Sequence, residues 1–201
     1  MSLKKSILVI VLVLLIDQIS KIYIKTNFAL HEQVTVFSWL KIVFVENKGM
    51  AWGFELPGSY GKLVLTLFRL IAICGIAYWL YDSVKKNSPA ILTFCIALIF
   101  AGAFGNIIDS VFYGVLFSKS TQIDIATFMP EGGGYEDVFY GKVVDMIQFT
   151  FYDDTLPEWI PFWGGEHFSF FDPVFNIADS AISIGVFLLV VFYKKAFPKQ
   201  A

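Results

Sequence analysis

Histidine, cysteine and clustered basic residues are all scarce in this chain of 201 residues. The two histidines, His31 and His167, lie far apart in the sequence, and Cys74 and Cys95 lack CxxC spacing. The sequence therefore gives no support for a zinc site, a thiol redox motif or a disulfide framework, and we expect no metal and no cofactor. With a net charge of −2 and no basic run, the chain also lacks the signature of a nucleic-acid-binding protein.

Charged residues of either sign make up only 16% of the chain, against about 25% in a typical soluble domain. Hydrophobic residues make up 57%, and the aromatic set is large, with 22 Phe, 9 Tyr and 5 Trp. Aromatic rings favour the boundary between membrane and water. This composition argues against two soluble domains and predicts one compact membrane domain over residues 1–201.

Four apolar segments are long enough to cross a bilayer, which takes about 20 residues in a helix. We predict a mostly α-helical integral membrane protein with four transmembrane helices, over residues 7–24, 62–81, 90–108 and 174–193. The first segment has no small-residue cleavage site, so we interpret it as a retained helix rather than a signal peptide.

The placement of lysine predicts the orientation of these helices. The two ends of the chain and the short connection after residue 81 hold seven lysines and one acidic residue, Asp82. By the positive-inside rule both termini are cytoplasmic, and segments 25–61 and 110–173 face outward. Residues 33–45 are β-branched and aromatic with partial alternation, which indicates short strands. The predicted fold thus includes a small β-containing outer layer and a long outer loop between the third and fourth helices.

Ionisable side chains inside a span are expensive, at about 2.5–3.5 kcal/mol each near the middle of a helix, and are functional candidates by default. The predicted helices contain Asp17, Lys21, Arg69 and Asp179, and Asp109 ends the third helix. Asp17 and Lys21 are four residues apart and therefore share one helix face. Two interpretations follow, an ion pair within the helix or a role for these residues beside an active site. A pair between Asp17 and Arg69, which lie at similar depth, is a further hypothesis.

An asparagine precedes an aspartate by three residues in two of the predicted helices, at Asn106–Asp109 and Asn176–Asp179. This spacing places both side chains of each pair on one helix face. For Asn106 and Asp109, end-capping and hydrogen bonding between helices are the alternatives to a role in a site. Asp145 is the sole acid of an apolar stretch that could form an interfacial strand or turn and approach Asp179.

Together, five motifs in this order on four predicted spans resemble the lipoprotein signal peptidases, also called signal peptidase II. The motifs are DQISK at residues 17–21, NKGMAWG at 47–53, GNIID at 105–109, VVD at 143–145 and FNIAD at 175–179.

The resemblance implies an aspartic endopeptidase whose catalytic dyad is Asp145 and Asp179. The positions that it implies as bordering or supporting the site are Asp17, Lys21, Asn47, Asn106, Asp109 and Asn176. It also implies that a prolipoprotein, with a diacylglyceryl group on its lipobox cysteine, is cut just before that cysteine. Globomycin-like peptides would inhibit the enzyme, which would be a monomer among the lipids of the bacterial inner membrane with its site toward the periplasmic leaflet.

Two departures from the family pattern stand out. The family usually has arginine after the aspartate that matches Asp109, whereas this chain has Ser110, and Lys142, Arg69 or no cation could take that place. Residues 117–140 also form a longer connection than is usual.

Two carboxylates held close together share one proton, which provides an acid and a base at neutral pH. Intramembrane acids also relay protons in transporters and channels, so a small proton-coupled transporter or channel is the alternative function. That alternative is disfavoured because the polar residues gather at the outer side and no inverted repeat is visible. A scaffold with structural ion pairs is a third possibility.

Overall fold

The computed structural model describes residues 1–49, 60–150, 152–170 and 173–198. Three helices in these ranges are long and apolar enough to cross a membrane. They are α1 (Leu3–Asn27), α2 (Gly61–Lys85) and a helix over Ala90–Leu116, which comprises α3 (Ala90–Ile108), the π-helical turn η2 (Asp109–Tyr113) and α4 (Gly114–Leu116). A long apolar helix is therefore present at each of the first three predicted spans, and the third continues beyond its predicted end.

The fourth predicted helix, residues 174–193, is wrong at its start. Val174–Phe175 form strand β6, and α5 covers only Ile177–Val191, followed by the short α6 (Tyr193–Ala196). Asn176 follows the strand and caps the helix, because its side chain accepts the Asp179 N–H while the Asp179 carboxylate accepts the Asn176 N–H. At about 1.5 Å per residue, α5 advances about 22 Å, less than the about 30 Å of a bilayer core.

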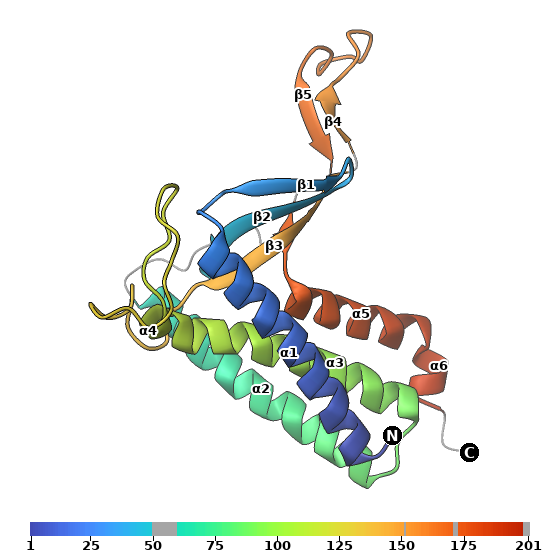
Figure 1. Ribbon diagram of the computed structural model, residues 1–201. Coiled ribbons are helices and arrows are strands. Elements are labelled where there is room, and N and C mark those ends of the chain that lie inside the picture. Colours follow the sequence, from blue (N-terminus) through green and yellow to red (C-terminus); the bar gives the residue numbers. More distant parts are fainter. Residues whose placement is uncertain (50–59, 151, 171–172, 199–201) are drawn as a thin grey trace.

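Helix α3 lies at the centre of the bundle and packs against α1, α2 and α5 (Figure 1). Glycine permits the close approach of α3 to α5, because a Cβ added at Gly102 would lie 2.2 Å from the carbonyl oxygen of Ala178. The first turn of α1 and helix α6 lie at the same end of the bundle, and the sheet lies at the other end (Figure 1).

A four-stranded antiparallel sheet covers the end of the bundle opposite helix α6 (Figure 1). Its strands are β1 (Gln33–Phe37), β2 (Leu40–Asn47), β3 (Val143–Phe149) and β6, in the order β1-β2-β3-β6. The strands predicted within residues 33–45 are thus confirmed. The sheet packs against α1 and η2 through a core that includes Ile24, Phe44, Tyr113 and Val144.

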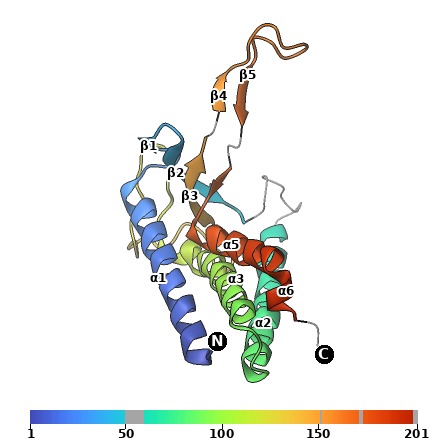
Figure 2. The ribbon, with the colours of Figure 1, turned by 90° about the vertical axis from the view of Figure 1, so that its right-hand side faces the viewer.

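A second hairpin, β4 (Tyr152–Thr155) and β5 (His167–Phe170), lies between β3 and β6 in the sequence. The two strands pair with each other in antiparallel register. Figures 1 and 2 show this hairpin projecting from the sheet, away from the helices.

Candidate active site

Asn176 lies where strand β6 passes into helix α5, and its buried side chain connects three elements. The Nδ2 atom donates to Oδ1 of Asp145 in β3 at 2.7 Å and to Oδ1 of Asn106 in α3 at 3.1 Å. The same group lies 3.3 Å from the carbonyl oxygen of Val144. Asn176 is therefore the link between the strand that carries Asp145 and the helix that carries Asp179.

Asp145 is only 2% exposed, because it lies in a central strand between β2 and β6. Its Oδ1 accepts from Asn176, and its Oδ2 accepts from Nδ2 of Asn47 at 3.2 Å. Burial, followed by the nearby charge of Asp179, raises the pKa of Asp145 to about 7. Near neutral pH this carboxyl group can thus hold or release a proton.

Asp179 lies in the first turn of α5, where the partial positive charge of a helix N-terminus favours a carboxylate. Its Oδ1 accepts from Nδ2 of Asn106 at 2.8 Å, and its Oδ2 accepts from the backbone N–H of Asn176 at 3.3 Å. The two predicted dyad carboxylates are therefore each bonded to Asn176 and are close enough to interact electrostatically.

Lys21 is completely buried and joins three acceptors. Its Nζ lies 2.9 Å from Oδ2 of Asp17, 2.8 Å from Oδ2 of Asp109 and 2.9 Å from Oδ1 of Asn106. The predicted intrahelical pair with Asp17 is confirmed, and it belongs to a larger network that reaches α3. Because Asn106 in turn contacts Asp179, this network supports the site directly.

Asp17 holds the beginning of α5, since its Oδ1 accepts the backbone N–H of Ala178 at 2.9 Å. The hypothesis that Asp17 pairs with Arg69 is wrong. The Arg69 guanidinium instead donates to the carbonyl oxygen of Gly49 and interacts electrostatically with Asp179. Gly49 has a φ of +95°, and a Cβ there would lie 2.6 Å from the guanidinium, so glycine permits this approach.

The cation beside Asp109 is Lys21, and neither suggested substitute for the family arginine takes that place. Lys142 donates to Oε2 of Glu46 at 2.9 Å, and Arg69 donates to Gly49. Asp109 also accepts from the Nε2 of Gln18 at 3.0 Å.

Ser110 is buried and lies beside another cation. Nζ of Lys62 is 3.4 Å from Oγ of Ser110 and 2.7 Å from the carbonyl oxygen of Lys48. The position after Asp109 is therefore close to a positive charge that comes from α2.

Sequence reasoning missed three polar residues around the site, namely Gln18, Glu46 and Lys62. Gln18 lies within the DQISK motif and donates to both Asp17 and Asp109. Its place in that motif was the signal that could have identified Gln18. Glu46 and Lys62 gave no such signal, because they lie near the ends of a strand and a helix, where charged residues are common.

The side chain of Glu46 is only 3% exposed and accepts hydrogen bonds from three side chains. Lys25 donates to Oε1 at 2.5 Å, Ser120 to Oε1 at 3.1 Å, and Lys142 to Oε2 at 2.9 Å. Burial acts to raise the pKa of Glu46, but the charges of Lys25 and Lys142 outweigh it and hold the pKa below its usual range. Through Ser120, this cluster attaches the long segment 117–140 to the sheet.

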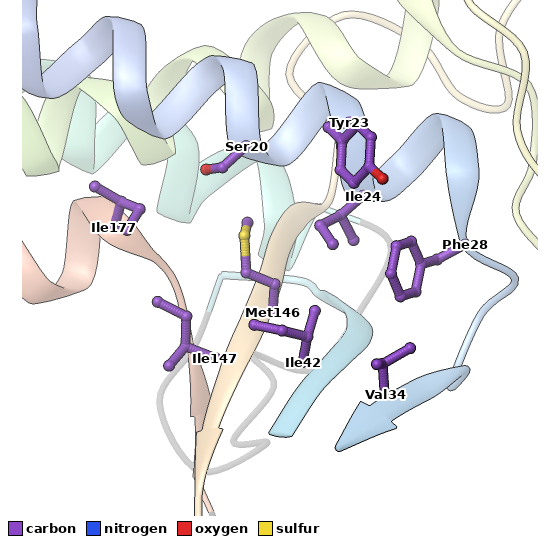
Figure 3. A pocket seen from close by; sticks show the side chains of 9 residues that line it. All are labelled: Ser20, Tyr23, Ile24, Phe28, Val34, Ile42, Met146, Ile147 and Ile177. Carbon is purple, nitrogen blue, oxygen red and sulfur yellow. The ribbon is translucent and has the colours of Figure 1, made fainter. Parts of the chain in front are cut away.

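An apolar groove of about 370 Å³ lies between α1 and the sheet (Figure 3). Helix α1 supplies Ser20, Tyr23 and Ile24 to its wall, and Phe28, which follows the last residue of α1, adds a fourth side chain. The remaining lining residues come from the sheet and the start of α5 and include Met146, which follows Asp145 directly. Among the residues that the structure describes, no group of three or more His, Cys, Asp or Glu is arranged to hold a metal ion.

The fold and the site define a class: a helical membrane protein with two neighbouring carboxyl groups at one end of its bundle, of which Asp145 is buried and Asp179 is partly buried. Such a pair is the arrangement of an aspartic hydrolase. The family model described as "Signal peptidase (SPase) II" matches residues 9–194. This chain belongs to that family, and it is a multi-pass membrane aspartic endopeptidase with lipoprotein signal peptidase activity. The transporter or channel alternative is thereby set aside.

Individual relatives agree with this assignment. The lipoprotein signal peptidase of Porphyromonas gingivalis (strain ATCC 33277) is 51% identical over 187 residues, which cover 92% of this chain and 81% of that protein. The lipoprotein signal peptidase of Amoebophilus asiaticus is 34% identical over 184 residues, which cover 90% of this chain and 73% of that protein. A solved structure described as a bacterial membrane enzyme, at 2.3 Å resolution, matches with a TM-score of 0.62 and 27% identity over 98% of this chain and 93% of that chain.

Proposed function

We propose that Asp145 and Asp179 are the catalytic dyad and activate water to cut a prolipoprotein just before its diacylglyceryl-modified cysteine. The observation that carries this proposal is the side chain and backbone N–H of Asn176, which bond to the two carboxyl groups. Lys21, Asp17, Asp109, Asn106 and Asn47 support the pair through the bonds described above.

In this mechanism the dyad holds one proton, which resides mainly on Asp145. Burial, followed by the nearby charge of Asp179, favours the neutral form of Asp145. Asp179 takes a proton from water as the water oxygen attacks the scissile carbonyl carbon, and Asp145 donates its proton to the carbonyl oxygen. The gem-diol then returns a proton to Asp145 while Asp179 protonates the leaving nitrogen and the C–N bond breaks.

The location of the dyad and of the neighbouring apolar groove supports a lipidated substrate. The dyad lies where the helices meet the sheet, so a signal helix would reach it on leaving the bilayer. The apolar groove beside β3 has a volume within the about 300–1,000 Å³ range of ligand pockets and suits an acyl chain. Globomycin-like peptides are proposed to bind at the dyad.

The proposed cytoplasmic location of both termini is supported by the seven lysines near the ends and the short connection. It is also supported by the position of the first turn of α1 and of α6 at the same end of the bundle in Figure 1. The site then faces the periplasmic leaflet of the inner membrane. Residues 1–201 are proposed to act as a single domain and as a monomer.

The decisive experiment is to replace Asp145 and Asp179 individually by asparagine and to measure cleavage of a diacylglyceryl-modified prolipoprotein by the purified enzyme. Loss of a general acid or base lowers the rate by about 10²–10⁴-fold. Asp137→Asn, at an exposed aspartate of segment 117–140, is the matched control and should cleave normally. Full activity in both dyad variants would remove these residues from the mechanism.

A further inference from the structure

The β4–β5 hairpin is inserted between the two segments that carry the dyad. Asp145 lies in β3, which precedes β4, and Asn176 and Asp179 follow β6, which comes after β5. Strands β3 and β6 pair with each other, as do β4 and β5. The hairpin therefore rises from the base on which the candidate active site is built, and it projects away from the helices (Figures 1 and 2).

Three large aromatic side chains at the tip of this hairpin are strongly exposed. Trp159 is 80% exposed, Phe162 is 96% exposed and Trp163 is 62% exposed. Phe162 has a φ of +72°, a conformation that is rare for a bulky residue and is kept mainly where surrounding structure or function demands it.

The tip nevertheless has a defined backbone. The N–H of Leu156 donates to Glu166 at 2.9 Å, and the N–H of Gly165 donates back to Leu156 at 2.9 Å. A further bond of 3.0 Å joins Gly164 to Ile160. The aromatic side chains are thus held outward by a closed turn.

Each strand of the hairpin also has one edge that no further strand covers within the described residues. Its sheet consists of β4 and β5, and no third strand joins them within the described residues. An isolated two-stranded hairpin is only marginally stable in water, and an open strand edge is a template for an extended peptide. The exposed aromatics and the open edges together indicate a surface that a polypeptide covers.

The charge of the hairpin disfavours a lipid surface as its partner. Residues 152–170 contain no lysine or arginine, and Asp154, Glu158 and Glu166 are exposed. Segments that lie on membranes combine apolar side chains with Lys or Arg. The hairpin also points away from the helices that lie in the bilayer (Figures 1 and 2).

We infer that the β4–β5 hairpin docks the extended part of the prolipoprotein that follows the lipid-modified cysteine; this inference rests on the proposed function. The mature chain leaves the dyad on the outer side, where the hairpin rises from the same strands. Main-chain hydrogen bonds to a strand edge, with side chains packed on the tip aromatics, would hold many different sequences. The hairpin would thereby lower the KM of substrates with a long mature segment without changing the chemical step.

A kinetic comparison of two substrates tests this inference. Both carry the same signal peptide and diacylglyceryl cysteine, but one continues for a long mature segment and the other ends a few residues after the cysteine. For the variant W159S/F162S/W163S, we expect KM for the long substrate to rise about tenfold with kcat unchanged, since a few aromatic residues dominate binding at such surfaces. The short substrate should be cleaved as by the parent enzyme.

The matched control is I123S/M129S, which removes exposed apolar side chains from segment 117–140, and it should leave both substrates unaffected. An unchanged KM for the long substrate, or an equal loss with both substrates, would overturn the docking role. If the parent enzyme cleaves neither lipidated substrate, the proposed function itself fails.

Photo-crosslinking identifies the occupant directly. A benzophenone amino acid placed at Phe162, in an enzyme that also carries Asp145→Asn, is expected to label residues that follow the lipid-modified cysteine. Labelling of the signal peptide, of phospholipid or of a second copy of this chain instead would overturn the inference.

Discussion

Lys21 donates a hydrogen bond of 2.9 Å to the side-chain oxygen of Asn106, and this contact determines the orientation of the Asn106 amide. Lysine is a donor only, so it requires an acceptor, and the amide nitrogen must then face away from it. That nitrogen lies 2.8 Å from Oδ1 of Asp179. An ion pair that could have been purely structural thus also orients a group that contacts the dyad.

Replacing Lys21 by methionine should destabilise the protein and impair cleavage. The carboxylates of Asp17 and Asp109 would remain buried without their cation, and breaking a buried pair in this way costs about 3–5 kcal/mol. Thermal unfolding in detergent and cleavage of the lipidated substrate measure the two effects.

A matched control comes from the end of α2, where the cap residue Lys86 forms the same i, i+4 pair with Asp82 at 2.7 Å but is exposed. Lys86→Met should leave the unfolding temperature nearly unchanged, because exposed pairs contribute little. An equal loss of stability in both variants would contradict the role assigned to burial.

The features that the sequence predicted best were those that depend on local pattern. Uninterrupted apolar runs predicted three long helices, and the third begins at the predicted residue 90 but continues to Leu116. The sequence motifs alone also mark Asp145 and Asp179 as the candidate dyad, and the structure brings both side chains to Asn176. The start of the fourth helix was missed because Val174 is as apolar as a helix residue, and only its pairing with Gln148 makes it a strand.

Depth along a helix was not enough to predict the partner of Asp17. Asp17 and Arg69 lie at similar depth, but a helix residue also has a direction around the helix axis, which apolar sequence leaves undefined. The direction in which a side chain points is set by contacts with segments that are distant in the sequence. Asp17, for example, accepts the backbone N–H of Ala178, which is 161 positions away. Glu46 and Lys62 were missed for the same reason, since their partners lie in other elements.

The rate of cleavage should fall as the pH rises through about 7. In the proposed mechanism Asp145 acts as the acid, and it loses its proton near its pKa of about 7. We therefore expect log(kcat/KM) to decline with a slope of about −1 above this value, measured with a substrate that lacks ionisable groups near the cut. A rate that rises through pH 7 would instead make Asp145 the base.

Asp145 should also make folding stability depend on pH. Its pKa of about 7 in the folded protein lies above the about 3.9 of an unfolded chain, so the folded state binds the proton more tightly. This contribution is fully present below pH 4, is lost as the pH rises to about 7, and amounts to about 4 kcal/mol.

The variant Asp145→Asn isolates that effect, because asparagine stays neutral. Its stability relative to the parent should increase between pH 4 and pH 7, and at pH 8 it should be the more stable protein although it is inactive. Unfolding temperatures across this pH range provide the measurement. Parallel curves for the two proteins would show that Asp145 does not titrate in the folded state as described.

Glu46 should be essential to hold segment 117–140 against the sheet. Glu46→Gln removes the charge that compensates buried Lys25, whose Nζ lies 2.5 Å from Oε1 of Glu46, and also weakens the contact with Ser120. A buried cation without its partner costs about 3–5 kcal/mol, so the variant should unfold at a lower temperature and be cleaved faster by proteases within residues 117–140. The double variant Lys25→Met/Glu46→Gln should recover much of the stability, because no unpaired charge then remains buried. If the double variant is as unstable as Glu46→Gln alone, the loss comes from packing rather than from the unpaired charge of Lys25.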